Sequence, residues 1–412
     1  MNETFYHKLS NGVQIVHRKT HSPVVYVGLM IGAGTRHEQA NENGMAHYIE
    51  HCVFKGTAHY TARQIINHIE GIGGEINAYT TKEETTFYAA TLSNHFRTTL
   101  HLLADMVLHP TFNKKETDKE VAVILDEIES YNDSPSELIY DDFENMIFEG
   151  SSLAMPILGT KKTLRRISKS PDIAINWMQQ HYRPERMVLF VQGNVSTKQV
   201  VSAAERELST INSPSIEKAP FTPFAGETTN GFLRTYKRHT HQTHIMLGSH
   251  AYPIGHQKQL TMYLLNNILG GGSMSSRLYL SLREKHGLVY NIDSQAVPLS
   301  DTGYWNIYLA CEPQHKDQCL ELCHKELQTL REVRLTSSQL QRALRQLEGQ
   351  MGIWAENQEN NALAMAKQML YHHRAPAWQE TFEKVRLITP AQLQEVANEV
   401  FSPEKIYTLL YD

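Results

Sequence analysis

The pattern of apolar and polar residues along the chain predicts a mixture of strands and amphipathic helices. Residues 24–31 and 305–311 are short runs of apolar and β-branched residues, which are typical of buried strands. Residues 336–351 repeat apolar positions every three or four residues, as one face of a helix does. Strands adjacent in sequence, joined by hairpin-like turns, favour mixed or antiparallel sheets over a doubly wound parallel sheet. The pattern therefore predicts an α+β fold.

The two halves of the chain echo each other at a shift of about 215 residues, which indicates an internal duplication. Residues 76–78 correspond to 290–292, and the helix predicted at 95–108 corresponds to one at 314–327. We therefore expect two structurally related α+β domains, each with a mixed or antiparallel sheet packed with helices.

The predicted boundary between the two domains lies at residues 211–230. This segment lacks periodicity and collects Pro, Ser, Thr and Gly, which is typical of a linker. The sequence of 412 residues is also long enough for two or three domains. We expect one domain at 1–210 and a related domain at 231–412.

The helix predicted at residues 44–54 is apolar nearly all round, as in a buried helix, yet it contains His47, Glu50 and His51. Positions i and i+4 share one helix face, so both histidines can bind one metal ion. Glu50 borders that face, where a carboxylate could accept the proton of a zinc-bound water. This H-x-x-E-H run is the inverted form of the zinc-peptidase motif H-E-x-x-H. Because unpaired buried polar groups are costly, the segment predicts a metal site.

A third metal ligand must come from elsewhere, because a catalytic zinc usually has three protein ligands and one water. Residues 117–129 are strongly helical in pattern, and they place Glu120 and Glu127 seven residues apart on one face. Glu127 is the candidate ligand, and Glu120 would orient a ligand or tune the water from behind. An acidic helix is also often only a solvated face, and the residues alone leave both interpretations open.

The run from Gly32 to Thr57 resembles the active-site region of the pitrilysin/insulinase family of zinc peptidases. In that family, the spacing from the second histidine to the third ligand matches His51 to Glu127, and a glutamate seven residues earlier matches Glu120. The resemblance covers essentially the whole chain and is closest to bacterial members similar to the mitochondrial processing peptidase. It implies the same duplicated architecture. At the shift of the repeat, residues 47–51 correspond to residues 263–267, which lack histidine and glutamate, so we expect a metal site in the first half alone.

Residues 73–88 resemble the family stretch G-G-x-x-N-A-x-T…E-x-T-x-Y. Turn glycines followed by β-branched and aromatic residues predict a strand. In the family this strand lies at a sheet edge and takes the substrate as an added strand, held by backbone hydrogen bonds. The resemblance therefore implies substrate-binding roles for Asn77, Ala78, Thr80 and Glu83.

A glycine-rich run and an Arg/Tyr pair in the second half complete the resemblance. The glycines 270–272 could suggest a phosphate loop, but no Gly-Lys-Ser/Thr follows them. In the family this loop touches substrate, which implies the same for Gly270, Gly271 and Gly272. Arg283 and Tyr290 match an Arg and a Tyr that help to hold the scissile peptide and its developing oxyanion. Without the resemblance, they would be interpreted as a surface charge and a core aromatic residue.

The resemblance implies a zinc-dependent endopeptidase that hydrolyses peptides or extended protein segments, with one Zn²⁺ per chain. The alternative is a non-catalytic subunit that binds substrate or scaffolds a peptidase assembly, because the family includes subunits that lack the metal site. The motif alone is also compatible with a zinc-dependent hydrolase of non-peptide substrates. The types of ligand are compatible with another divalent metal.

The resemblance further implies a homodimer with shared catalytic sites. In four-domain members, the zinc domain faces the last domain of the other half, whereas this chain supplies two domains. In a two-fold dimer, Arg283 and Tyr290 would serve the zinc of the partner chain. A heterodimer with a related chain is the other arrangement.

Composition narrows the remaining classes of partner. The net charge of −5, with no basic stripe, argues against nucleic acid. No apolar run of membrane-spanning length and no signal or transit peptide is seen, so we expect no membrane association and a cytoplasmic, bacterial-type location.

Four cysteines do not suggest a disulfide framework. Cys319 and Cys323 could hold a second metal with His324, but buried free thiols are the more usual arrangement.

Overall fold

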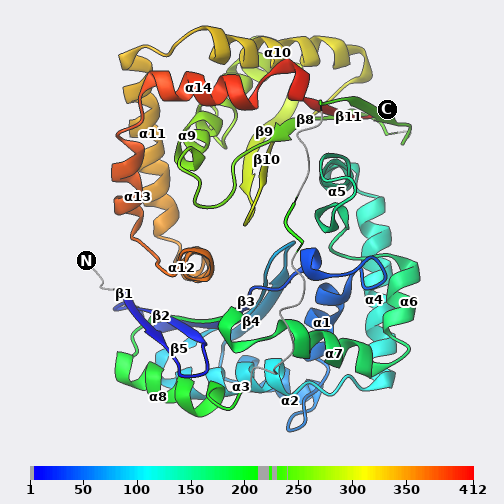
Figure 1. Cartoon of the computed structure of the whole chain (residues 1–412), viewed down its shortest axis with the longest axis vertical. Helices are drawn as coiled ribbons and strands as arrows, with labels where there is room; N and C mark the ends of the chain where they lie inside the picture. The colour runs from blue at the N-terminus through cyan, green and yellow to red at the C-terminus, as the bar shows by residue number, and fades with distance from the viewer. Residues whose placement is uncertain (1–3, 212–221, 225–229, 239) are drawn as a thin grey trace. The chain divides into compact units, whose positions relative to one another are not determined.

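The computed structural model describes residues 4–211, 222–224, 230–238 and 240–412. The chain forms two compact units, each built on one β-sheet with helices (Figure 1). Unit 1 comprises Met1–Glu129, Met155–Phe221 and Ala355–Pro376, and unit 2 comprises Ser130–Ala154, Thr222–Trp354 and Ala377–Asp412.

The sheet of unit 1 has six strands in the order β1-β2-β6-β3-β5-β4, so that β1 and β4 are its edges. Strands β2 and β6 pair in parallel, and the other neighbours are antiparallel. The strands are β1 (Thr4–Lys8), β2 (Gln14–Lys19), β3 (Val24–Ile31), β4 (Glu75–Thr80), β5 (Thr85–Leu92) and β6 (Met187–Gly193).

Side chains alternate along each strand, and because both faces of this sheet carry apolar residues, helices cover both faces. Val25, Val27 and Leu29 of β3 pack in the main core of unit 1, whereas Met30 contributes to the apolar cluster that includes α12. The helices of unit 1 are α1 (Met45–Val53), α2 (Ala62–Glu70), α3 (Phe96–Leu108), most of α4 (Lys114–Asn132), α6 (Lys161–Ile167), α7 (Pro171–His181), α8 (Thr197–Leu208) and α12 (Gln358–His372).

The sheet of unit 2 has five strands in the order β7-β11-β8-β10-β9, with β7 and β11 parallel. This order repeats β2-β6-β3-β5-β4 of unit 1, including the position of the parallel pair. The predicted fold of two related α+β domains is therefore confirmed. The strands are β7 (Leu233–Tyr236), β8 (Thr243–His250), β9 (Val289–Pro298), β10 (Gly303–Cys311) and β11 (Tyr407–Tyr411).

The helices of unit 2 pack on its sheet in the same two-sided way. They are α5 (Pro135–Ile147), α9 (Gln259–Leu269), α10 (Lys316–Glu332), most of α11 (Ser337–Ala355), α13 (Trp378–Val385) and α14 (Pro390–Val400). Short 3₁₀ turns occur at η1 (Thr35–His37), η2 (Ser93–His95), η3 (Ser152–Ala154), η4 (Pro184–Arg186), η6 (Pro313–His315) and η7 (Pro403–Lys405), and η5 (Tyr279–Lys285) is a π-helix.

The two units each contain a helix from the other half of the sequence. α5 packs its apolar residues, among them Phe143, against the unit 2 sheet at Met246 and Leu409. α12 packs Met365 on the unit 1 sheet beside Phe190. The predicted ranges 1–210 and 231–412 therefore correspond to the main part of each unit but not to whole units. Periodicity shows that a helix is amphipathic, not which sheet it covers. The predicted linker at 211–230 lies mostly outside the described residues.

Most predicted elements are confirmed, but residues 73–88 are not one strand. They form a hairpin of β4 and β5 joined by a turn at residues 81–84. Three consecutive charged residues of this turn, Lys82, Glu83 and Glu84, are all buried, which is unusual for a turn. The residues that bind these side chains lie far away in the sequence, so the local sequence did not predict that the turn would be buried. The predicted strands at 24–31 and 305–311 are present as β3 and β10, and the predicted helices at 95–108, 314–327 and 336–351 as α3, α10 and α11.

Helix α12 holds this turn through buried Glu84, which is 1% exposed. Lys367 Nζ lies 2.7 Å from Glu84 Oε1, and the Tyr371 hydroxyl donates to Glu84 Oε2 at 2.6 Å. A carboxylate this deeply buried needs such donors, because losing one leaves an incompletely compensated charge. The turn after β4 is thus bound to α12, the helix that covers the sheet face carrying Met30 and Phe190.

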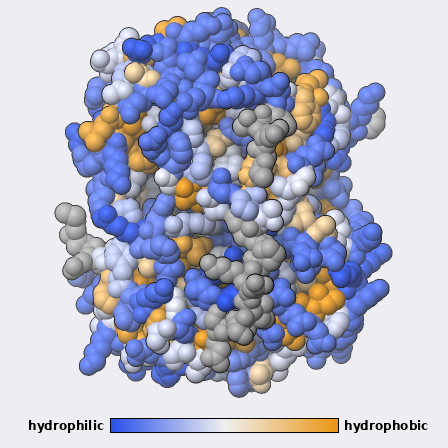
Figure 2. All heavy atoms as spheres, viewed as in Figure 1, coloured by the Kyte–Doolittle hydropathy of each residue, from blue (hydrophilic) through white to orange (hydrophobic). Residues whose placement is uncertain are grey.

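Hydrophilic residues cover most of the face drawn in Figure 2, and apolar residues appear there in small groups. Within the part of the chain that the structure describes, no helix is both long and apolar enough to cross a membrane.

The contact of α12 with the turn predicts a measurable loss of stability when its hydroxyl donor is removed. Tyr371→Phe should lower the free energy of unfolding by about 1.5–3 kcal/mol, because it removes a hydrogen bond to a buried charge. Tyr263→Phe is the matched control, since Tyr263 is 44% exposed. It should change stability by less than about 0.5 kcal/mol. Equal stability of the two variants in urea denaturation would contradict the role of Tyr371.

Candidate metal centre

Helix α1, which carries the H-x-x-E-H run, begins after Gly44 with its first N–H groups bound by Glu38. Glu38 accepts hydrogen bonds from the N–H groups of Gly44 and Ala46, both at 2.8 Å, and from the Asn43 amide at 3.3 Å. Gly44 has φ 90°, which favours glycine. Burial raises the pKa of Glu38 to about 8, and the hydrogen bonds act in the opposite direction. The sequence analysis missed Glu38, which lies too far before the helix to match a capping box.

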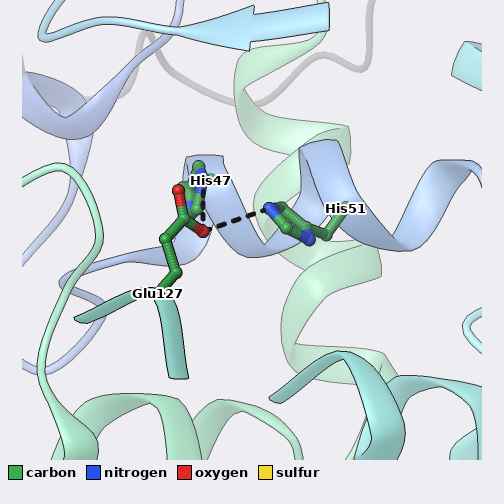
Figure 3. A group of neighbouring side chains, drawn as sticks. All are labelled: His47, His51 and Glu127. Carbon is green, nitrogen blue, oxygen red and sulfur yellow. Dashed lines mark ion pairs between the residues drawn. The ribbon is translucent and has the colours of Figure 1, made fainter. Parts of the chain in front are cut away.

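His47, His51 and Glu127 converge in unit 1, as Figure 3 shows. The two histidines come from α1 and the glutamate from α4. Glu127 Oε2 lies 3.8 Å from His47 Nε2 and 3.6 Å from His51 Nε2. Ligands about 2.1 Å from a tetrahedral zinc are roughly 3.4 Å apart, so these separations are close to those of a metal site. Among the described residues, no other group of His, Cys, Asp or Glu converges in this way.

Both imidazoles present their Nε2 atoms to Glu127. His47 is 7% exposed, and burial, helped by nearby His51, lowers the pKa of its imidazole to about 3, so the ring is neutral. His51 Nδ1 lies 3.2 Å from Glu120 Oε2, which favours a proton on Nδ1 and a free lone pair on Nε2. This donor set suits zinc, and other divalent metals as well.

Glu120 is in turn held by a residue that the sequence analysis missed. Lys55 Nζ lies 2.8 Å from Glu120 Oε1, while the other carboxylate oxygen faces His51. Lys55 follows His51 by four residues, just beyond the end of α1 at Val53. The four-residue spacing from His51 could have indicated that Lys55 lies on the same side of the helix as His51. A lysine at a helix end is, however, usually a solvated cation. The sequence-predicted position of Glu120, one layer behind the candidate ligands, agrees with this geometry.

Glu50 lies beside the cluster without belonging to it. The Thr80 hydroxyl donates to Glu50 Oε2 at 2.6 Å. Burial raises the pKa of Glu50, whereas the Thr80 hydrogen bond and the nearby His51 side chain lower it. A half-buried carboxylate with a raised pKa beside a metal site is suited to accepting and returning a proton.

The predicted substrate-binding residues of the first half lie in three different environments. Asn77 and Ala78 lie on edge strand β4, where the Asn77 side chain accepts a hydrogen bond from the Ala78 N–H at 2.9 Å. Thr80 faces Glu50. Glu83 is 5% exposed and pairs with Arg36 at 2.5 Å. The structure thus gives the Glu83 carboxylate a part in holding the turn, which was not expected.

The remaining predicted residues belong to unit 2. Gly270 ends α9, and its carbonyl accepts a hydrogen bond from the Ser294 N–H of β9 at 3.1 Å, while Gly271 and Gly272 continue the loop. The Arg283 guanidinium lies over the Tyr290 ring, 5.1 Å from its centroid, and Tyr290 is 74% exposed. The structure therefore brings Arg283 and Tyr290 together, and Tyr290 is not the core aromatic that its pattern alone suggested.

The cysteines of the second half form part of the core of unit 2. Cys311, Cys319 and Cys323 are free and at most 1% exposed. None of them belongs to a metal-type cluster within the residues that the structure places. The cysteines of the second half are thus buried free thiols.

Two family models match successive parts of the chain. The model described as Insulinase (Peptidase family M16) matches residues 14–161, which include all three converging residues. The model described as Peptidase M16 inactive domain matches residues 170–347.

Relatives of similar length are found in Bacillus subtilis and Rickettsia felis. The uncharacterized zinc protease YmxG of Bacillus subtilis is 32% identical over 403 residues, covering 97% of this chain and 96% of the relative. An uncharacterized zinc protease of Rickettsia felis is 32% identical over 402 residues, covering 97% and 93%.

Two crystal structures share the fold over nearly their full length. A protease from Helicobacter pylori has a TM-score of 0.91 at 20% identity, with 100% of both chains covered. A peptidase M16 inactive domain from Pseudomonas fluorescens has a TM-score of 0.88 at 19% identity, covering 99% of this chain and 97% of the other. At these identities the likeness shows the fold alone.

The geometry predicts that metal binding depends on the histidines of α1. His47→Ala should reduce bound zinc from about one equivalent to near zero after dialysis, because it leaves two protein ligands. His21→Ala, at an exposed position of the same unit, should bind zinc as the unchanged protein does. Elemental analysis of both variants provides the measurement. Retention of a full equivalent by the His47 variant would show that the metal binds elsewhere.

Proposed function

The chain belongs to the insulinase family, peptidase family M16, and from this premise we propose that it is a zinc-dependent endopeptidase that hydrolyses peptides or extended protein segments. The observation that carries the proposal is the convergence of His47, His51 and Glu127, with Glu50 beside them. Relatives that are named zinc proteases support the choice of metal.

In this proposal, His47 and His51 hold one Zn²⁺ per chain through their Nε2 atoms, and Glu127 holds it through its carboxylate. When bound, zinc supplies Lewis-acid polarisation of the scissile carbonyl and of the attacking water. Glu50 accepts the proton from that water and returns it to the leaving amine, a task suited to its raised pKa. Glu120 keeps the His51 ring in the tautomer that exposes Nε2.

Edge strand β4 supports a preference for extended substrates. It pairs with β5 on one side and with no other strand among the described residues. An extended peptide can add to such an edge through main-chain hydrogen bonds, which read few side chains. We therefore propose unfolded or short peptides of varied sequence as substrates, with Asn77 and Ala78 at the edge where they bind.

Arg283 and Tyr290 are proposed to hold the scissile peptide and its developing oxyanion. Their stacked pair and the exposure of Tyr290 support a role outside the core. They belong to unit 2, whereas the candidate metal ligands belong to unit 1. We propose that a homodimer shares these groups between its subunits, so that each chain gives zinc to one site and donors to the other.

Replacing the proposed base separates catalysis from metal binding. Glu50→Gln should keep about one zinc, because the ligands remain, and lose turnover roughly 100-fold or more on a fluorogenic peptide library. Glu70→Gln, at an exposed position on α2, serves as the control. Full activity of the Glu50 variant would contradict the proposal. Peptide binding without cleavage by the unchanged, zinc-loaded protein would instead support the non-catalytic alternative.

Mixing two inactive homodimers tests the shared site. Glu50→Gln and Tyr290→Phe homodimers should each be weak, because loss of an oxyanion donor typically costs about a hundredfold. After subunit exchange, about half of the dimers are mixed and carry one intact site, so about a quarter of the activity should return. Absence of recovery after demonstrated exchange, or an active species that sediments as a monomer, would contradict the shared site.

A further inference from the structure

We infer that Thr80 is a positioning residue for Glu50, and that its side chain acts on the base instead of on the substrate. This inference rests on the proposed function and changes one role implied by the family resemblance, in which Thr80 belongs to the substrate-binding strand. Its foundation is the 2.6 Å hydrogen bond from the Thr80 hydroxyl to Glu50 Oε2.

The strand geometry directs Thr80 toward α1. Side chains alternate along a strand, so Ile76, Ala78 and Thr80 share one face of β4. Ile76 and Ala78 pack against the core cluster that contains α1. Thr80, the last residue of β4, therefore points to the same side and reaches the carboxylate of Glu50 on α1. The backbone edge of β4 remains a separate feature, available to a substrate strand.

The hydroxyl of Thr80 has two acceptors within reach, and Glu50 is the nearer one. Thr85, which pairs with Thr80 across the hairpin, has its hydroxyl 3.5 Å away. The Thr85 hydroxyl donates to the carbonyl of Ala33 at 2.9 Å. Thr85 therefore has no proton left for Thr80 and offers only a distant acceptor, whereas Glu50 Oε2 lies 2.6 Å from the Thr80 hydroxyl. Thr80 thus gives its one proton to Glu50 Oε2, which leaves Oε1 to accept the proton of the attacking water.

The turn that follows Thr80 is braced from two sides, which fixes the hydroxyl in place. On one side, the N–H of Arg36 donates to the carbonyl of Lys82 at 2.7 Å. A Cβ at Gly34 would lie 2.3 Å from the carbonyl oxygen of Thr81, so only glycine allows this approach. On the other side, Glu84 is bound by α12. The donor is thus preorganised before substrate binds.

The two possible roles of Thr80 predict different kinetics. A residue that orients the base acts on the chemical step, so its loss lowers kcat. A residue that holds substrate equally well before and during the reaction acts on KM. Thr80→Val keeps the shape of the side chain and removes the hydroxyl. It should lower kcat roughly 10- to 100-fold, the range expected for losing a hydrogen bond to a charged group, with KM changed less than about threefold.

Two matched variants complete the experiment, in which kcat, KM and bound zinc are measured on one peptide. Thr80→Ser keeps the hydroxyl and should retain kcat within about threefold. Thr91→Val removes the hydroxyl of a buried threonine on the same hairpin, one that lies 3.1 Å from the Thr99 hydroxyl, and should leave kcat unchanged. Full zinc content in Thr80→Val assigns the loss to the base and not to the metal ligands.

Several results would overturn the inference. A rise in KM at unchanged kcat would return Thr80 to substrate binding, and equal kcat for Thr80→Val and Thr91→Val would remove its role. If Thr80→Val does not fold, Thr80→Ala is compared with Thr80→Ser: loss in the first alone supports the inference, and equal activity overturns it. Glu50→Gln is measured in parallel. Its full activity would overturn the proposed function as well, whereas an inactive Glu50→Gln beside a normal Thr80→Val overturns the role of Thr80 alone.

Discussion

The structure of the candidate site depends on one constraint: three polar side chains belong to a helix whose other side chains are mostly buried. His47, Glu50 and His51 cannot all turn to water, so neighbouring elements must supply their partners. α4 supplies Glu120 and Glu127, and the end of β4 supplies Thr80. The arrangement of these elements around α1 is therefore also the arrangement of the chemistry.

The duplication shows that most of the fold is not specific to the candidate metal site. Both units use the same strand order, with the parallel pair at the same place. In unit 2, helix α9 occupies the corresponding place in the sequence repeat, but its residues 263–267 lack histidine and glutamate. Its Asn266 instead donates to the carbonyl of Ser294 at 2.9 Å, which satisfies a buried amide within the protein. A common scaffold thus carries a metal-type cluster in one unit and an ordinary core in the other.

Local spacing predicted the parts of the site that lie within one helix, and failed where the partners are distant. The i, i+4 pair of His47 and His51 follows from helix geometry, but the choice of Glu127 needed the family resemblance. The sequence did not show that Thr80 faces Glu50, or that Glu83 is buried against Arg36. Both depend on the hairpin turn at 81–84, whose bracing residues lie about 45 to 290 positions away in the sequence.

The exchanged helices have a consequence for synthesis on the ribosome. The unit 1 sheet remains uncovered on one face, at Met30 and Phe190, until α12 has been translated. At about 5–20 residues per second, the ribosome needs roughly 10–30 s to proceed from the end of the first half to residue 372. During this interval the nascent chain exposes an apolar sheet face that no residue yet made can cover in the native way. Helper proteins that shield nascent chains therefore have a defined target here, and unit 1 can finish folding only after most of unit 2 has been synthesised.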